Sequence, residues 1–251
     1  MQLLALDTST DRMSVAVGRS IEGRQQVWSD EAEGGAQASS RLIPMVRAQM
    51  ARAGLAFSEL DAIVFGRGPG AFTGLRTACA VAQGLALGAR TDAPGAPRSV
   101  PVLPLDSLMA VAEQARIAHG GSQQPWDVLA MLDARMDEVY WGSYRWHGSH
   151  WQVLAPPALA RPREVPFVAG QVLAGNVFAT YGDRLPAASA GAPQIAALPL
   201  ASAMLGLAPT LLAQGQGVDA ALALPLYIRD KVASTTAERA AAKAAEAQPA
   251  S

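Results

Sequence analysis

A glycine-rich segment between an apolar strand and an apolar helix is the feature that most constrains how this chain of 251 residues folds. The pattern predicts the strand within Asp61–Gly66 and the helix from about Gly74 to Ala89. Glycines permit positive φ angles and close backbone approach, and the free N–H groups at a helix N-terminus attract anions. The segment is therefore either an anion-binding loop or a tight structural turn, and a glycine pattern alone favours the turn. For a phosphate or a carboxylate, the candidate residues are Gly68, Pro69, Gly70, Phe72, Thr73, Gly74 and Arg76.

A second polar cluster follows the first apolar strand. Leu3–Leu6 is a short apolar run that ends at the turn-forming residues Asp7, Thr8, Ser9 and Thr10. Hydroxyl groups and backbone amides at a strand end can hold a phosphate or a metal-bound water, and the same residues equally well form an Asx turn. Apolar residues then alternate over 12–19, and a further run lies near 26–29. This pattern predicts that the chain opens with a meander of three antiparallel strands.

Two helices are expected to cover this first sheet. The first would be capped by Ser39 or Ser40, run to about Ala53 and stop at Gly54. The helical period places Leu42, Ile43, Val46, Met50 and Ala53 on one face, and Arg41, Gln49, Arg52 and Met45 on another. The second helix, after the glycine-rich segment, is apolar almost all round except for Arg76 and Gln83. It must therefore be covered on more than one side, either by its own sheet and the first helix or by a second protein.

Charged residues follow a further apolar strand, which is predicted over Val128–Leu132. Asp133, Arg135 and Glu138 would either contact a ligand or form a salt-bridged connection between strands, and the residue pattern favours the connection. A β-hairpin with its turn at His147–His150 is predicted next. These two histidines have chelating spacing, but a mobile turn with no evident carboxylate nearby argues against a metal site, and none is expected.

Charge and composition narrow the classes of protein further. The chain has 20 basic and 21 acidic residues, so it lacks the surplus positive charge that an extended nucleic-acid footprint needs. Its only cysteine, Cys79, lies in an apolar helical pattern that favours a buried, inert thiol. There is no basic leader before the first apolar run, and no run approaches the ~18 residues of a membrane helix. We therefore expect a soluble, cytoplasmic protein.

Several motifs together carry a resemblance to a known family. They are Leu-Ala-Leu-Asp-Thr-Ser-Thr at 4–10, Arg-Leu-Ile-Pro-Met-Val at 41–46, Gly-Arg-Gly-Pro-Gly-Ala-Phe-Thr-Gly-Leu-Arg at 66–76, Ala-Gln-Gly-Leu-Ala-Leu-Gly at 82–88, Asp-Ala-Arg-Met-Asp-Glu-Val-Tyr at 133–140 and Pro-Leu-Tyr-Ile-Arg at 225–229. With them the chain closely resembles the TsaB (YeaZ) family of tRNA threonylcarbamoyladenosine biosynthesis proteins, which are paralogues of TsaD. The match is specific through Tyr144 and thin over 151–224.

The resemblance implies an α/β fold of the actin-like (ASKHA, ribonuclease H-like) class, with two tandem subdomains of mixed five-stranded sheets flanked by helices. Residues 1–106 would form the first subdomain and carry the partner-binding helices, and about 220–231 would return to it. Residues 107–219 would form a reduced second subdomain, and 232–251 a flexible tail.

The resemblance also implies a non-catalytic subunit of the tRNA threonylcarbamoyltransferase complex. It would form a heterodimer with TsaD, work with the ATPase TsaE, and contact tRNA only through the complex. It implies no cofactor bound by this chain alone, and it leaves open both ADP or ATP at a composite site and a homodimer through the same helices. The implied interface residues are Arg41, Leu42, Met45, Gln49, Arg52, Leu75, Ala78, Cys79, Ala82, Gln83 and Ala86.

One difference from the catalytic paralogue and two departures from the family pattern bear on these expectations. The catalytic paralogue holds its metal with a His-x-x-x-His pair, and the matching place here, Leu103–Met109, contains no histidine. Many members have a histidine before the first helix, whereas this chain has Gln37. The connection over 91–99 is longer than usual. The alternative reading is a free-standing actin-like kinase or ATPase for a small metabolite, which would use Asp7 and the loop Gly68–Gly74.

Overall fold

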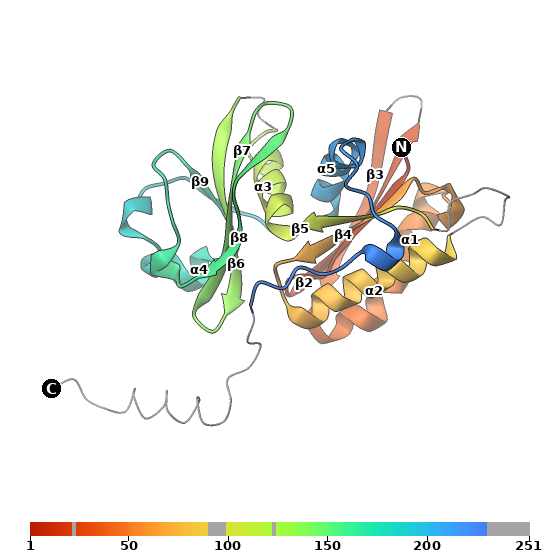
Figure 1. Cartoon of the computed structure of the whole chain (residues 1–251), viewed down its shortest axis with the longest axis horizontal. Coiled ribbons are helices and arrows are strands. Elements are labelled where there is room, and N and C mark those ends of the chain that lie inside the picture. The colour runs from red at the N-terminus through yellow and green to blue at the C-terminus, as the bar shows by residue number, and fades with distance from the viewer. Residues whose placement is uncertain (22–23, 90–98, 122–123, 230–251) are drawn as a thin grey trace, which may run out of the picture.

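Two mixed sheets of five strands each define two subdomains that lie side by side (Figure 1). The computed structural model describes residues 1–21, 24–89, 99–121 and 124–229, so the segment 91–98 and the tail 232–251 lie outside the described residues. The first sheet has the order β3-β2-β1-β4-β5 and consists of β1 (Leu3–Asp7), β2 (Arg12–Ile21), β3 (Arg24–Glu33), β4 (Ala62–Gly68) and β5 (Val102–Asp106). The second has the order β10-β9-β6-β7-β8 and consists of β6 (Trp126–Arg135), β7 (Glu138–Trp146), β8 (Trp151–Ala160), β9 (Val172–Gly175) and β10 (Gln194–Ala196).

The first sheet is covered on both faces because its central strands are apolar throughout. Alternate residues such as Leu4 and Leu6 in β1 point to α1 (Ala38–Ala53) and α2 (Phe72–Gly88), which share one core. Their neighbours Leu3 and Ala5 point to the opposite core, which α5 (Ala201–Ala213) closes. The meander of three strands, the helix that ends at Gly54 and the strand before the glycine-rich segment are all confirmed.

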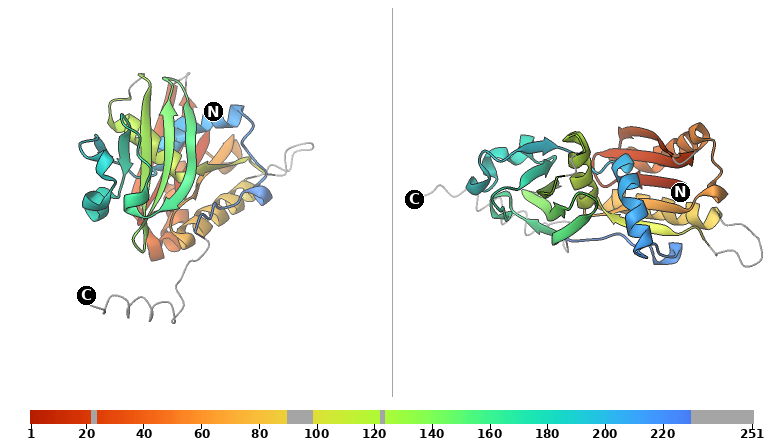
Figure 2. Two further views of the ribbon diagram at one scale, coloured as in Figure 1. Left: turned by 60° about the vertical axis from the view of Figure 1, so that its left-hand side comes forward. Right: turned by 90° about the horizontal axis from the view of Figure 1, so that it is seen from above.

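The chain returns to the first subdomain earlier than predicted. We expected the return at about residue 220, but α5 already packs on β1 and β2 of the first sheet. It also packs against α3 (Ser107–Ala118), which covers the second sheet, and the two helices lie together at the junction (Figure 2). The short α4 (Phe178–Tyr181) lies at the far side of the second subdomain. Within the described residues no helix is long and apolar enough to cross a membrane.

A C-terminal strap, residues 220–229, then runs along α2 and crosses to the second subdomain (Figure 1). Gln83 Nε2 donates to the carbonyl oxygen of Ala223 at 2.9 Å, and the Leu226 amide donates to Arg67 O at 2.7 Å. The strap thus covers the flank of α2 that carries Gln83. The opposite flank, with Val81, packs into the core that α2 shares with α1.

Three details of α1 differ from the prediction. Neither Ser39 nor Ser40 caps the helix: Gln37 is the N-cap, without a side-chain cap bond, and the Ser40 hydroxyl donates back to its carbonyl oxygen. Gln49 is buried, whereas Ile43 is 45% exposed. Met45 is partly buried against the core rather than exposed. The faces differ from the prediction because periodicity alone does not fix where the buried arc of a helix begins.

The hairpin between β6 and β7 has an unusual backbone. Arg135, Met136 and Asp137 have φ angles of 62°, 56° and 62°, the left-handed region that costs non-glycine residues about 1 kcal/mol each. Two-residue hairpin turns need this geometry, and nature usually supplies glycine or asparagine there. The turn holds Arg135 at the gap between the subdomains.

We predict that Met136→Gly raises the free energy of unfolding by about 1 kcal/mol, because glycine adopts the left-handed conformation without steric cost. Chemical denaturation measures this directly. The matched control is Ser149→Gly in the β7–β8 turn, where φ is not positive, so glycine should give no gain there. A loss of stability in Met136→Gly would contradict the strain.

Candidate functional site between the subdomains

A cavity of about 290 Å³ lies between the two subdomains and brings the sequence motifs together. Its walls come from four segments: 9–11, 70–72, 132–136 and 226–229, with Leu75, Tyr140 and Asn176 between them. Of the predicted site residues, Ser9, Thr10, Gly70, Phe72, Asp133 and Arg135 line it. The others, Asp7, Thr8, Gly68, Pro69, Thr73, Gly74, Arg76 and Glu138, do not.

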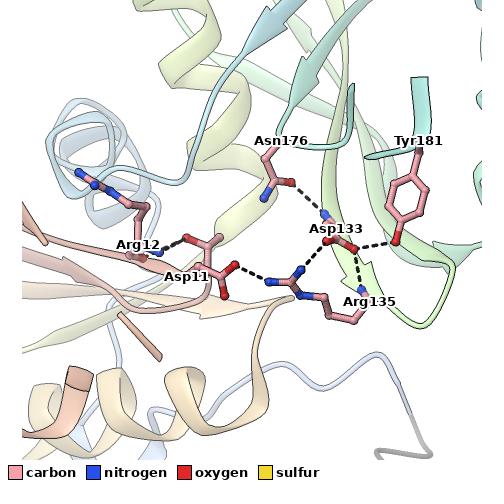
Figure 3. Close-up of polar contacts among 7 residues, drawn as sticks. Asp11, Arg12, Asp133, Arg135, Asn176 and Tyr181 are labelled. Atoms are coloured by element: carbon pink, nitrogen blue, oxygen red, sulfur yellow. Dashed lines mark hydrogen bonds and ion pairs between the residues drawn. The ribbon is translucent and has the colours of Figure 1, made fainter. Parts of the chain in front are cut away.

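Arg135 links the two subdomains across this cavity (Figure 3). Its guanidinium forms an ion pair with Asp11 of the first subdomain and a second one with Asp133 Oδ2 at 3.2 Å. These partners, the Asp11 hydrogen bond first, raise the pKa of Arg135 above its usual value. Because Arg135 and Asp11 are largely exposed, the link contributes little to stability, and it serves to fix the position of the side chains.

Asp133 is held in place by its own subdomain. Its Oδ1 accepts from the Tyr181 hydroxyl at 2.8 Å and from the Arg135 amide at 2.7 Å, and its amide donates to Asn176 Oδ1 at 2.9 Å (Figure 3). Burial and the hydrogen bond to Asp133 raise the pKa of Tyr181 to about 12. Asp11, Asn176 and Tyr181 were not among the predicted site residues, because residues distant in the chain become neighbours only through the two-sheet arrangement.

Two of the predicted site residues that do not line the cavity, Arg76 and Glu138, contact the strap. The Arg76 guanidinium lies 3.8 Å from the centroid of the Phe72 ring, and its Nε donates to the Tyr227 hydroxyl at 3.1 Å. Glu138 forms an ion pair with Arg229, which also donates to the carbonyl oxygen of Arg135 at 3.2 Å. Arg76 and Glu138 therefore anchor the C-terminal segment. The charged residues Asp133, Arg135 and Glu138 thus lie at the connection between strands that the residue pattern favoured. Asp133 and Arg135 also face the cavity.

Asp7 is enclosed rather than available to a ligand. It is 1% exposed, and its Oδ1 accepts from the amide and the hydroxyl of Ser9 at 2.8 and 2.7 Å. Its Oδ2 accepts from the hydroxyl of Ser107, the first residue of α3, at 3.3 Å. Burial is the main cause that raises the pKa of Asp7 from 3.8 to about 6, and the hydrogen bonds only partly offset it.

The glycines are explained by the close approach of the chain to itself. A Cβ at Gly66 would lie 1.7 Å from Asp7 Oδ2, one at Gly74 1.8 Å from Thr8 O, and one at Gly70 2.4 Å from Ser9 O. Gly68 has a φ of 120°, and a cis peptide bond joins it to Pro69. The Thr8 hydroxyl donates to Gly74 O at 2.6 Å. Of the two interpretations of this segment, the tight structural turn accounts for these glycines.

Burial corrects the predicted interface. The side chains of Leu42, Leu75, Ala78, Cys79, Ala82 and Ala86 are buried in the core of the first subdomain, and so is Gln49. Because these side chains are buried within the chain's own fold, they cannot contact a partner in this arrangement. Arg41 and Arg52 are exposed, and Met45 and Gln83 are partly so.

What α2 presents outward is an outer stripe of Ala80, Gly84 and Leu87. Leu87 is 50% exposed, and a Cβ built on Gly84 would have no other atom within 4 Å. The stripe is apolar and lies between the strap on one flank and α1 on the other. It was missed from the sequence because a helix that is apolar all round has no polar side to mark the solvent.

His147 and His150 are exposed and stack with ring centroids 5.0 Å apart. No third metal-ligating side chain joins them, and the described part of the chain contains no group of three such residues.

Comparison with known proteins identifies the family. Residues 33–247 match the family model described as "TsaD: tRNA N6-adenosine threonylcarbamoyltransferase". The tRNA threonylcarbamoyladenosine biosynthesis protein TsaB of Escherichia coli is 30% identical over 93% of this chain and 96% of its own length. The chain belongs to the TsaB (YeaZ) family.

Further similar proteins support membership of the TsaB family. TsaB of Haemophilus influenzae is 40% identical over 56% of this chain and 52% of its own length. The solved structure of YeaZ from Pseudomonas aeruginosa has 40% sequence identity and a TM-score of 0.75, and it covers 90% of this chain and 99% of its own. The predicted actin-like fold and kinship with TsaD are thus confirmed, and the membership supports a role in tRNA threonylcarbamoyladenosine biosynthesis.

We predict that Asp7→Asn stabilises the protein above pH 6 and not at pH 4. Asparagine keeps the shape without the buried charge: its Oδ1 still accepts from the Ser9 amide and hydroxyl, and its Nδ2 donates to the Ser107 hydroxyl oxygen in place of the bond that Oδ2 accepted. Because the pKa of Asp7 is raised from 3.8 to about 6, the neutral acid is favoured in the folded state, and this contribution is lost as the pH rises through about 6. The gain for the variant at pH 8 should approach about 3 kcal/mol.

The measurement is the free energy of unfolding of both proteins from pH 4 to pH 8. A difference between them that does not change with pH would show that Asp7 is not destabilised by ionisation.

Proposed function

We propose that this chain is the non-catalytic scaffold and activator subunit of a cytoplasmic tRNA threonylcarbamoyltransferase complex. It acts with TsaD and TsaE in the threonylcarbamoylation of the adenosine adjacent to the anticodon in ANN-decoding tRNAs. The observation that carries the proposal is the apolar outer stripe of α2, which the chain's own fold leaves uncovered. We assign the contact with TsaD to this stripe and the neighbouring surface of α1.

The contacts at the junction of the subdomains favour a scaffold role for this chain over a catalytic one. The resemblance implies that the catalytic paralogue carries its metal-binding histidines just after the strand that corresponds to β5 of this chain. Here Asp106 ends that strand and forms an ion pair with Arg67 Nε at 2.5 Å. The next residue, Ser107, donates to the enclosed Asp7. The Asp106 ion pair therefore joins β4 to β5 within the first sheet, and the Ser107 hydroxyl ties the start of α3 to β1.

The same geometry weighs against the free-standing kinase or ATPase. Such an enzyme would need Asp7 to reach a nucleotide-bound metal, but both of its oxygens are engaged within a buried turn. The cavity between the subdomains remains a place for a small anion or nucleotide, with Arg135 and Gly70 in its wall. We assign any ADP or ATP to a composite site formed with the partners.

We predict that Gly84→Trp weakens the complex with the cognate TsaD. The indole would stand on the outer stripe, where nothing in the chain itself obstructs it, so the fold should persist while the helix of a partner is held away. The measurement is the dissociation constant by calorimetry, and we expect an increase of more than about tenfold.

The matched control is Gly182→Trp, at an exposed glycine of the second subdomain that likewise has no atom near its Cβ position. It should leave the affinity unchanged. Ala82→Glu is not a suitable probe, because Ala82 is fully buried and a carboxylate there would unfold the core. Normal affinity in Gly84→Trp would refute the assigned surface.

A further inference from the structure

The two helices of the proposed interface carry positive charge without any negative charge. Residues 38–53 and 72–88 contain Arg41, Arg47, Arg52 and Arg76, which are four of the chain's 20 basic residues, and none of its 21 acidic ones. A chain with almost equal numbers of both signs would place several acids on 33 helical residues if they were spread evenly. The interface surface is therefore basic although the protein as a whole is not.

The arginines of α1 are not neutralised by the chain itself. Arg41, Arg47 and Arg52 are exposed, and none of them forms an ion pair with a carboxylate of the described residues. Arg41 and Arg52 donate only to the neutral side chains of Gln37 and Gln49. By contrast, Arg67, Arg116, Arg135, Arg145, Arg184 and Arg229 each have a carboxylate partner.

Their positions on the helix matter as much as their charge. At 100° per residue, Arg41 and Arg52 fall on one side of the exposed arc of α1, and Arg47 falls on the other, next to Ile43. An apolar centre flanked by cations is the arrangement of a protein interface with a polar rim. Such charges set the rate of association and the choice of partner more than the final affinity.

We propose that this surface selects a partner whose facing helices carry Asp or Glu opposite Arg41, Arg47 and Arg52, and that it disfavours a second copy of this chain. The proposal rests on the proposed function and specifies the chemistry of its partner. In a two-fold symmetric dimer the same patch faces itself, so α1 arginines of both copies would approach one another with no carboxylate on either helix. Like charges at that distance repel, whereas an acidic partner is attracted.

The proposal predicts opposite salt dependences for the two assemblies. Because salt screens exposed charges, raising KCl weakens the complex with the acidic partner and relieves the repulsion between identical copies. The test compares the full chain with its cognate TsaD by calorimetry, and the chain alone by sedimentation equilibrium, at low and at high KCl. We expect heterodimer affinity to fall about tenfold between about 50 and 500 mM KCl, and self-association to strengthen.

Reversing the charge of the α1 arginines provides a second test of the proposal. Arg41→Glu/Arg47→Glu should weaken the heterodimer about tenfold at low salt and remove most of its salt dependence. Arg52 is left intact because it lies in the last turn of α1, where a cation favours the helix. The control is Arg161→Glu/Arg163→Glu, an equal change of charge at two exposed arginines of the second subdomain without ion pairs, and it should behave as the unmodified chain.

The outcomes separate the two proposals. If no complex with TsaD forms at any salt concentration, the proposed function fails and this inference fails with it. If the complex forms and Gly84→Trp disrupts it, but neither KCl nor Arg41→Glu/Arg47→Glu changes its affinity, the proposed function stands and the acidic partner surface is refuted. Self-association that weakens with salt would overturn the argument against a second copy.

Discussion

The turn at Asp7, packed into the glycines that follow β4, is the contact on which the rest of this structure depends. Three glycines, at 66, 70 and 74, let the chain approach residues 7–9 more closely than any Cβ would allow. That approach sets where α2 begins, and through the Ser107 hydroxyl it also ties the start of α3 to the first sheet. This buried polar turn therefore helps to fix the relative position of the two subdomains, together with the packing of α5 on α3.

The same contact supports our proposal that this chain is a non-catalytic subunit. Here the carboxylate of Asp7 is enclosed by Ser9 and Ser107, and the Arg67–Asp106 ion pair lies at the junction beside it. The Asp7 carboxylate thus links the first sheet to α3, and our proposal of a partner contact rests on the apolar surface that α2 leaves uncovered.

Much of the fold could be predicted from the sequence, because short-range patterns determine it. Alternating and continuous apolar runs located β1, β2 and β4, and Gly54 marked the end of α1 in its left-handed conformation. The sequence did not reveal α5, whose residues are almost uniformly small or apolar, nor that this helix lies on the first sheet. The interface that the resemblance implied included Ala82, which is buried, and an all-apolar helix such as α2 gives no contrast between its inner and outer faces.

The candidate site was predicted only in part for a related reason. Ser9, Gly70 and Arg135 do meet at one cavity, but Asp11, Asn176 and Tyr181 belong to the same network and have no local signature. Their roles arise from contacts between distant segments. The glycines illustrate the converse: their pattern was conspicuous in the sequence, and it reflects packing against residues 7–9, which is invisible without the fold.

Reconstituted tRNA modification tests the central claim most directly. The modified nucleoside would be quantified by mass spectrometry after incubating tRNA with threonylcarbamoyl adenylate, TsaD, TsaE and either the unmodified chain, the Asp7→Asn protein or no third protein. Our account predicts full modification with both forms of the chain and little without it, because Asp7 is structural and the chain acts by contact. Loss of modification with the Asp7→Asn protein, while its complex with TsaD stays intact, would contradict the account.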